Sequence, residues 1–119
     1  MISASSRAMV LTALTLVFLT LRLEGHAILL SATPASNEIV HGPTVHIQLK
    51  FSSRIDVKRS RLILLLPGGT ERVLSAEEAL PGTLKSDVAQ LAAGQYLLRW
   101  QVLAEDGHIT RGELTFRTQ

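Results

Sequence analysis

The sequence predicts an all-β fold, a sandwich or barrel of short strands, preceded by an N-terminal export signal. Three observations predict the fold. After residue 25, apolar and polar residues alternate in several segments, and turns containing glycine or proline separate these segments. No long segment there has the period of about 3.6 residues that marks a helix. Alternation places successive side chains on opposite faces of a sheet, so one face of each strand can be buried.

The first 25 residues are predicted to be a cleaved signal peptide. Residues 8–21 form an uncharged apolar run with Arg7 before it and Arg22 after it, and Gly25 stands at its exit. A basic start, an apolar stretch of this length and a small residue at the exit are typical of a secretory signal. The run is short for a membrane helix, which needs about 20 residues. A retained anchor is the alternative, because the residues before Gly25 match a cleavage site imperfectly.

Cleavage after Gly25 leaves one domain, residues 26–119, which is long enough for a single modest core. Its formal net charge is +1 instead of +2, because cleavage removes two basic residues and one acidic residue. A nearly neutral domain lacks the strongly basic face of a nucleic-acid-binding protein. The main basic cluster is interpreted as a solvated loop; it consists of Arg54, Lys58, Arg59 and Arg61.

The first half of the domain contains two clear strand patterns and a turn. Residues 45–52 alternate strictly, with valine, isoleucine, leucine and phenylalanine on one face and polar side chains on the other. Residues 61–66 form a largely apolar run that ends at Pro67-Gly68-Gly69-Thr70, a strong turn signal. We expect residues 71–74 to return from this turn as a strand. Residues 75–90 are mixed and polar, and their strand pattern is weak.

The second half of the domain predicts a hairpin. Residues 94–104 alternate, with Trp100 among the side chains on the inward face, and it is predicted to be a core residue. A loop follows at residues 105–108, and residues 112–117 resume as a strand. In this last strand Leu114 and Phe116 are predicted to point inward.

The chain contains no cysteine, so a metal ion would have to be held by nitrogen and oxygen atoms. Of the four histidines, His41 lies in a turn and His46 on the polar face of a strand, which are ordinary places for solvated histidines. His26 would become the mature N-terminus. There its α-amine and imidazole could close a chelate ring on one ion, although cleavage could also leave a histidine at this position by chance.

The segment Asp106-Gly107-His108 is the other candidate ligand pair. A carboxylate and an imidazole two residues apart can point into one site if the loop turns suitably, and Gly107 gives the backbone that freedom. Binding residues also concentrate on loops that a rigid scaffold holds. The alternative is an Asp-Gly turn followed by a solvated histidine.

These segments together resemble the CopC-type periplasmic copper-resistance proteins, including the YobA-like members. The resemblance extends from His26 to the C-terminus, and the order and spacing of its segments make it specific. In chain order they are His26-Ala27, Ser31 to Ala35, Val45 to Ser52, Leu91 to Tyr96 with Arg99-Trp100, Asp106-Gly107-His108, and Gly112 to Phe116.

The resemblance implies a Greek-key, cupredoxin-like (immunoglobulin-like) β-sandwich or barrel of about seven strands. It implies a periplasmic protein that carries or buffers Cu(II) in copper resistance or uptake, with an inner-membrane copper importer of the CopD type as partner. The family's Cu(II) site uses the N-terminal amine and imidazole and a late Asp-x-His pair. By this resemblance His26, Asp106 and His108 are the metal ligands, and such nitrogen and oxygen donors suit Cu(II).

The sequence departs from the family pattern in two places. Ser53 stands where the family often has glutamate after Phe-Ser, and whether Asp56, Ser53 or water completes the site is open. The only methionines are Met1 and Met9, both in the predicted signal, which excludes a thioether site for Cu(I).

Two other functions are consistent with the same histidines. One is a copper monooxygenase of the histidine-brace type, which usually presents an aromatic face to a polymer. This reading is disfavoured, because the aromatic residues of the domain are all predicted to point inward; they are Phe51, Tyr96, Trp100 and Phe116. The other is an immunoglobulin-like structural domain with incidental histidines. The prediction is therefore a copper-binding protein that is not an enzyme.

Overall fold

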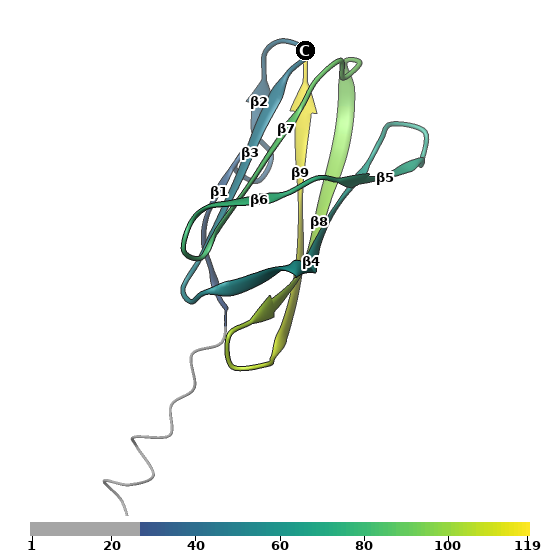
Figure 1. The fold of residues 1–119 in the computed structure, drawn as a ribbon. Helices are drawn as coiled ribbons and strands as arrows, with labels where there is room; N and C mark the ends of the chain where they lie inside the picture. Colours follow the sequence, from purple (N-terminus) through teal and green to yellow (C-terminus); the bar gives the residue numbers. More distant parts are fainter. Residues whose placement is uncertain (1–26) are drawn as a thin grey trace, which may run out of the picture.

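The structure is a computed structural model, and it describes residues 27–119. These residues form two β-sheets that pack face to face, with no helix among them (Figure 1). The predicted all-β sandwich is confirmed. The predicted signal peptide, residues 1–25, and His26 lie outside the described residues. Within the described part of the chain, no helix has the length and apolar character needed to cross a membrane.

The two sheets contain four and five strands. The order in the first is β1-β3-β7-β6, and in the second it is β2-β9-β8-β4-β5. Most neighbouring strands are not consecutive in the chain, so the chain passes repeatedly from one sheet to the other, as a Greek-key fold requires. The strands of the first sheet are β1 (Leu29–Thr33), β3 (Val45–Phe51), β7 (Thr83–Val88) and β6 (Glu77–Leu80). Those of the second are β2 (Ile39–Val40), β9 (Ile109–Thr118), β8 (Gly94–Ala104), β4 (Ile55–Leu65) and β5 (Glu71–Leu74).

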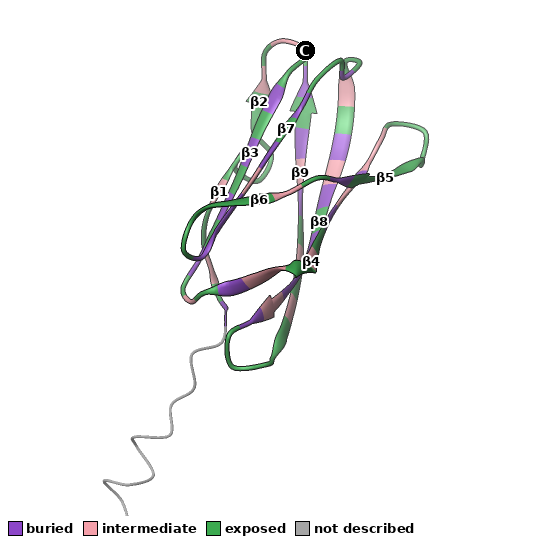
Figure 2. Cartoon of the chain, in the orientation of Figure 1, coloured by how far each residue is buried: buried purple, intermediate pink, exposed green. Residues whose placement is uncertain are grey.

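The core lies between the sheets and is built from the inward faces predicted by alternation (Figure 2). Every second residue of β3 is buried, and the same alternation holds along β8. Tyr96 and Phe116 stack with their ring centroids 5.5 Å apart. The aromatic residues of the described chain are all buried, as predicted, with exposed fractions of 4% for Phe51, 1% for Tyr96, 6% for Trp100 and 1% for Phe116.

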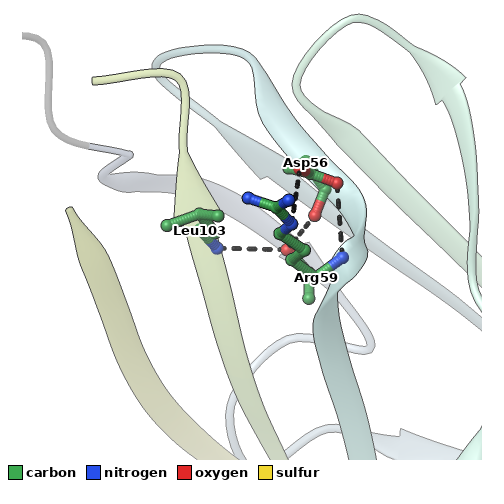
Figure 3. Close-up of polar contacts among 4 residues, drawn as sticks. Asp56, Arg59 and Leu103 are labelled. Carbon is green, nitrogen blue, oxygen red and sulfur yellow. Dashed lines mark hydrogen bonds and ion pairs between the residues drawn. The ribbon is translucent and has the colours of Figure 1, made fainter. Parts of the chain in front are cut away.

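Strand β4 is longer than the predicted segment 61–66, because it begins at Ile55 and contains a bulge. Asp56 pairs with Leu103, and the next pair is Arg61 with Gln101, so several residues of β4 oppose a short stretch of β8. The backbone carbonyl of Asp56 accepts a hydrogen bond from Ser60 Oγ at 2.6 Å, and Ser60 Oγ in turn accepts one from the Leu103 N–H at 3.1 Å (Figure 3). The polar bulge interrupts the alternation, which is why the sequence pattern did not predict this part of the strand.

Residues 75–90, where the pattern was weak, contain the two strands β6 and β7. They form a hairpin that turns at Pro81-Gly82. All four residues of β6 are exposed, whereas β7 buries four of its six. Because an edge strand with no buried face does not alternate between apolar and polar residues, its sequence pattern could not predict it.

Candidate metal centre

The loop between β8 and β9 holds the predicted pair of Asp106 and His108. Gly107 has a φ of 90°, a left-handed conformation that residues with a side chain rarely adopt. The Gly107 N–H donates a hydrogen bond to the Ala104 carbonyl at 3.0 Å, and the Ala104 N–H donates one to the His108 carbonyl at 2.8 Å. These bonds close a tight loop, so the side chains two residues apart are turned toward each other.

The Asp106 carboxylate and the His108 imidazole are in contact. His108 Nδ1 lies 3.1 Å from Asp106 Oδ2, and the His108 backbone N–H donates to Asp106 Oδ1 at 3.0 Å. The His108 side chain is 55% exposed and the Asp106 side chain 22% exposed. The loop therefore offers one nitrogen and one oxygen donor side by side at the surface.

The N-terminal end of the described chain lies at the same end of the sandwich as this loop (Figure 1). The Ile28 N–H donates to Ser52 Oγ at 2.9 Å, and the Ser52 N–H donates to the Ile28 carbonyl at 2.8 Å. Two residues further along, the Arg54 carbonyl accepts a hydrogen bond from the Glu105 N–H at 3.0 Å. Ala27 is fully buried in the core. The segment 52–54 thus holds the start of the domain on one side and the Asp106–His108 loop on the other.

Two further residues were considered as ligands from the sequence. The Asp56 carboxylate faces its own strand, where Oδ1 accepts a hydrogen bond from the Arg59 N–H at 3.3 Å and Oδ2 lies 3.8 Å from Arg59 Nε (Figure 3). Ser53 Oγ donates to the Arg54 carbonyl at 3.4 Å. Among residues 27–119, no group of three histidine or acidic side chains is arranged to hold a metal ion. His26 is outside this range.

His41 and His46 are exposed, as predicted for solvated histidines. His46 has a partner that the sequence did not reveal. Its Nδ1–H donates a hydrogen bond to Asp87 Oδ1 at 2.7 Å, across the pairing of β3 with β7. Because β7 lies in the segment without a clear pattern, no local signal aligned these two residues.

The hydrogen bond from His46 holds the pKa of Asp87 below its ordinary value of 3.8. A lowered pKa in the folded state means that ionised Asp87 stabilises the fold at neutral pH, and that this stabilisation is lost as the pH falls below 3.8. We expect His46→Gln to move the Asp87 pKa back toward the ordinary value. A carboxyl NMR titration measures the shift, and an Asp87 titration curve identical in the two proteins would contradict it.

Comparison with known structures identifies close likenesses of the fold. CopC from Methylosinus trichosporium OB3b is 27% identical, with a TM-score of 0.70 over 79% of this chain and 94% of that one. PcoC from Escherichia coli, described as a methionine-rich copper resistance protein, is also 27% identical, with a TM-score of 0.62 over 79% of this chain and 99% of that one. The fibronectin(III)-like modules of Clostridium thermocellum CbhA, at 17% identity and a TM-score of 0.52, share the fold alone.

A search of curated proteins found no match. The profile of the CopC domain, in contrast, matches residues 29–119, which is most of the chain and nearly all of its described part. The matched segment begins at β1 and includes both sheets and the Asp106–His108 loop. The structural likeness to CopC and PcoC agrees with this match. The chain therefore belongs to the CopC domain family.

Proposed function

We propose that this chain is an exported protein that binds Cu(II) and carries or buffers it in the periplasm, in copper resistance or uptake, without catalysing a reaction. Membership of the CopC family supports a role with copper. PcoC, one of the similar structures, is described as a copper resistance protein. The proposal includes removal of residues 1–25 as a signal peptide, which leaves residues 26–119 as the mature domain.

In this proposal the ligands are His26, Asp106 and His108. The supporting observation is that Ile28 and Glu105 are both hydrogen-bonded to the segment 52–54, so the start of the domain and the loop are held at one place. Consecutive Cα atoms are about 3.8 Å apart, so the Cα atom of His26 lies about this distance from the Cα atom of the buried Ala27.

The donor set fits Cu(II). The amine and imidazole of His26 and the imidazole of His108 supply nitrogen, and Asp106 supplies oxygen, which suits the tetragonal preference of Cu(II). Metal binding requires a neutral amine and neutral imidazoles, and the amine loses its proton to a metal at little cost near neutral pH. The chain has no cysteine, and its methionines lie before residue 10, so soft sulfur ligands for Cu(I) are not part of the site.

The exposed position of His108 is suited to transfer of the ion by ligand exchange. Its side chain is half exposed, so an incoming ligand can approach the ion from solvent without opening the core. The proposed recipient is an inner-membrane copper importer of the CopD type. A polymer-oxidising enzyme is not favoured, because the aromatic residues among residues 27–119 are all buried, with Trp100 the most exposed at 6%.

The proposal is tested by electron paramagnetic resonance of the exported protein with one equivalent of Cu(II), after mass spectrometry has established that the chain begins at His26. We expect a tetragonal spectrum with nitrogen coupling in the wild type. In His108→Ala we expect weaker nitrogen coupling and a lower affinity.

His46→Ala is the matched control, because it removes another exposed histidine far from the loop in the sequence, and it should leave the spectrum unchanged. A wild-type spectrum like that of aqueous Cu(II), or one that His108→Ala does not alter, would contradict the proposed site.

A further inference from the structure

A basic surface lies beside the Asp106–His108 loop, on β4 and the outer face of the five-stranded sheet. Ile55 pairs with Ala104 at the end of β8, so the β4 bulge adjoins the loop that follows β8. The backbone contact between Arg54 and Glu105 joins the same two segments. The basic side chains of the bulge region are exposed, but the predicted loop is wrong for three of them, which lie in strand β4 because the bulge lengthens that strand; the four are Arg54, before the strand, and Lys58, Arg59 and Arg61 within it.

The outer face of this sheet is hollowed next to the bulge. A surface hollow of about 430 Å³ extends across β4, β8 and β9, and its lining includes Arg61, Ile63, Arg99, Gln101, Arg111 and Glu113. Strand register explains how these side chains meet. Arg61, Gln101 and Arg111 form one row across the three strands, and Ile63, Arg99 and Glu113 form the next. The hollow therefore has a cationic end and a more neutral end.

Among the described residues, the ion pairs within the hollow leave two of its three guanidinium groups without an acidic partner. Arg99 lies 3.7 Å from Glu71 and 3.5 Å from Glu113, so its charge is balanced. Arg111 Nε donates to the neutral Gln101 at 3.0 Å, and within residues 27–119 Arg61 makes no ion pair. Neighbouring strands are about 4.8 Å apart, which places the backbones of Arg61 and Arg111 about 10 Å apart on either side of Gln101.

We propose that this hollow docks an acidic segment of a partner protein. Carboxylates of the partner would pair with Arg61 and Arg111, since guanidinium groups bind carboxylates in a bidentate fashion. Ile63 and its cross-strand neighbour Val73, which is 61% exposed, supply an apolar patch beside the charges. The inference extends the proposed function, because docking at this surface brings a copper-accepting partner next to Asp106 and His108.

The shape and composition of the surface favour a protein over other anionic partners. A flat bilayer cannot enter a hollow, whereas a side chain on a protein segment can. A nucleic-acid surface would be more strongly basic than a domain whose ten basic residues from position 27 onward face nine acidic ones. The Gln101 amide and the apolar patch also provide contacts that a peptide can use and a simple anion cannot.

The test is the binding of a fluorescent peptide with four glutamates around a central leucine, measured by anisotropy on the metal-free exported protein in the presence of a chelator. We expect saturable binding that weakens with added salt. In Arg61→Glu/Arg111→Glu we expect it to weaken about tenfold or more, because each reversal replaces an attraction with a repulsion. If the double reversal impairs folding, Arg61→Gln/Arg111→Gln removes the two charges and should weaken binding in the same direction.

Lys50→Glu/Lys85→Glu is the matched control, since it makes the same change of net charge on β3 and β7 of the other sheet. Equal weakening of peptide binding in the two double variants would show that net charge alone determines binding, and would overturn the docking site. Binding to anionic phosphatidylglycerol vesicles that depends on Arg61 and Arg111, with no peptide binding, would overturn the protein partner in favour of a membrane. Copper loading by Arg61→Glu/Arg111→Glu, followed by electron paramagnetic resonance, should equal that of the wild type, so failure of this inference is distinguishable from failure of the copper site.

Discussion

Extending the mature chain by a short flexible tetrapeptide in front of His26 is expected to lower the affinity for Cu(II) by more than about 100-fold. The extension moves the free amine away from the His26 imidazole and so breaks their shared chelate ring. Loss of an outer-shell partner of a metal ligand already costs about 10- to 100-fold in affinity, so loss of a direct ligand should cost more. Isothermal titration calorimetry in competition with a chelator of known affinity measures the change.

The control for this prediction is the same tetrapeptide added after Gln119. The C-terminus lies at the opposite end of the sandwich from the Asp106–His108 loop (Figure 1), where the Gln119 carbonyl accepts a hydrogen bond from Gly42. An extension there should leave both affinity and spectrum unchanged. Circular dichroism would establish that both extended proteins are folded. Equal affinity for Cu(II) in the two extended proteins would show that the terminal amine is not a ligand.

The strands that the sequence predicted are those with one buried face. Throughout β3, and from Gln95 to Ala104 in β8, a buried residue follows every exposed or half-exposed one, so the sequence of these strands alternates with a period of two. Strand β6 has no buried residue, and the bulge in β4 replaces alternation with a run of polar residues held by Asp56 and Ser60. Local patterns could not predict these elements, because long-range pairing determines them.

The candidate site likewise has one part that the local sequence could predict and another that depends on long-range contacts. The pairing of Asp106 with His108 follows from local spacing and from the glycine between them, so the sequence was sufficient to suggest it. The position of the chain start relative to this loop depends on hydrogen bonds between Ile28 and Ser52, which are 24 residues apart. The role of Asp56 also needed the structure, because its contact with Arg59 is made inside a bulge that the sequence pattern did not reveal.

The hairpin that carries the loop is supported by the packing of Trp100 against Gly112. These residues are cross-strand partners. Trp100 lies four residues before the end of β8, and Gly112 in β9 lies four residues after His108. A Cβ atom on Gly112 would lie 2.3 Å from Trp100 Cζ2 and 2.5 Å from Cε2. Real Cβ atoms do not approach other atoms so closely, so the indole ring occupies the place of the missing side chain. The Trp100 side chain belongs to the core cluster, and the residue is 6% exposed.

Gly112→Ala is therefore expected to destabilise the domain by about 1–3 kcal/mol or more, the usual range for forcing extra atoms into a packed core. Urea unfolding followed by circular dichroism measures the change. Gly68→Ala is the contrasting control: its φ of 96° strains the new side chain, but no atom lies within 4 Å of the added Cβ, so it measures the cost of backbone strain without a clash. Adding Trp100→Leu to Gly112→Ala should cost less than the sum of the two single changes, because the smaller side chain relieves the clash. Strictly additive costs would show that the indole ring is not what excludes a side chain at position 112.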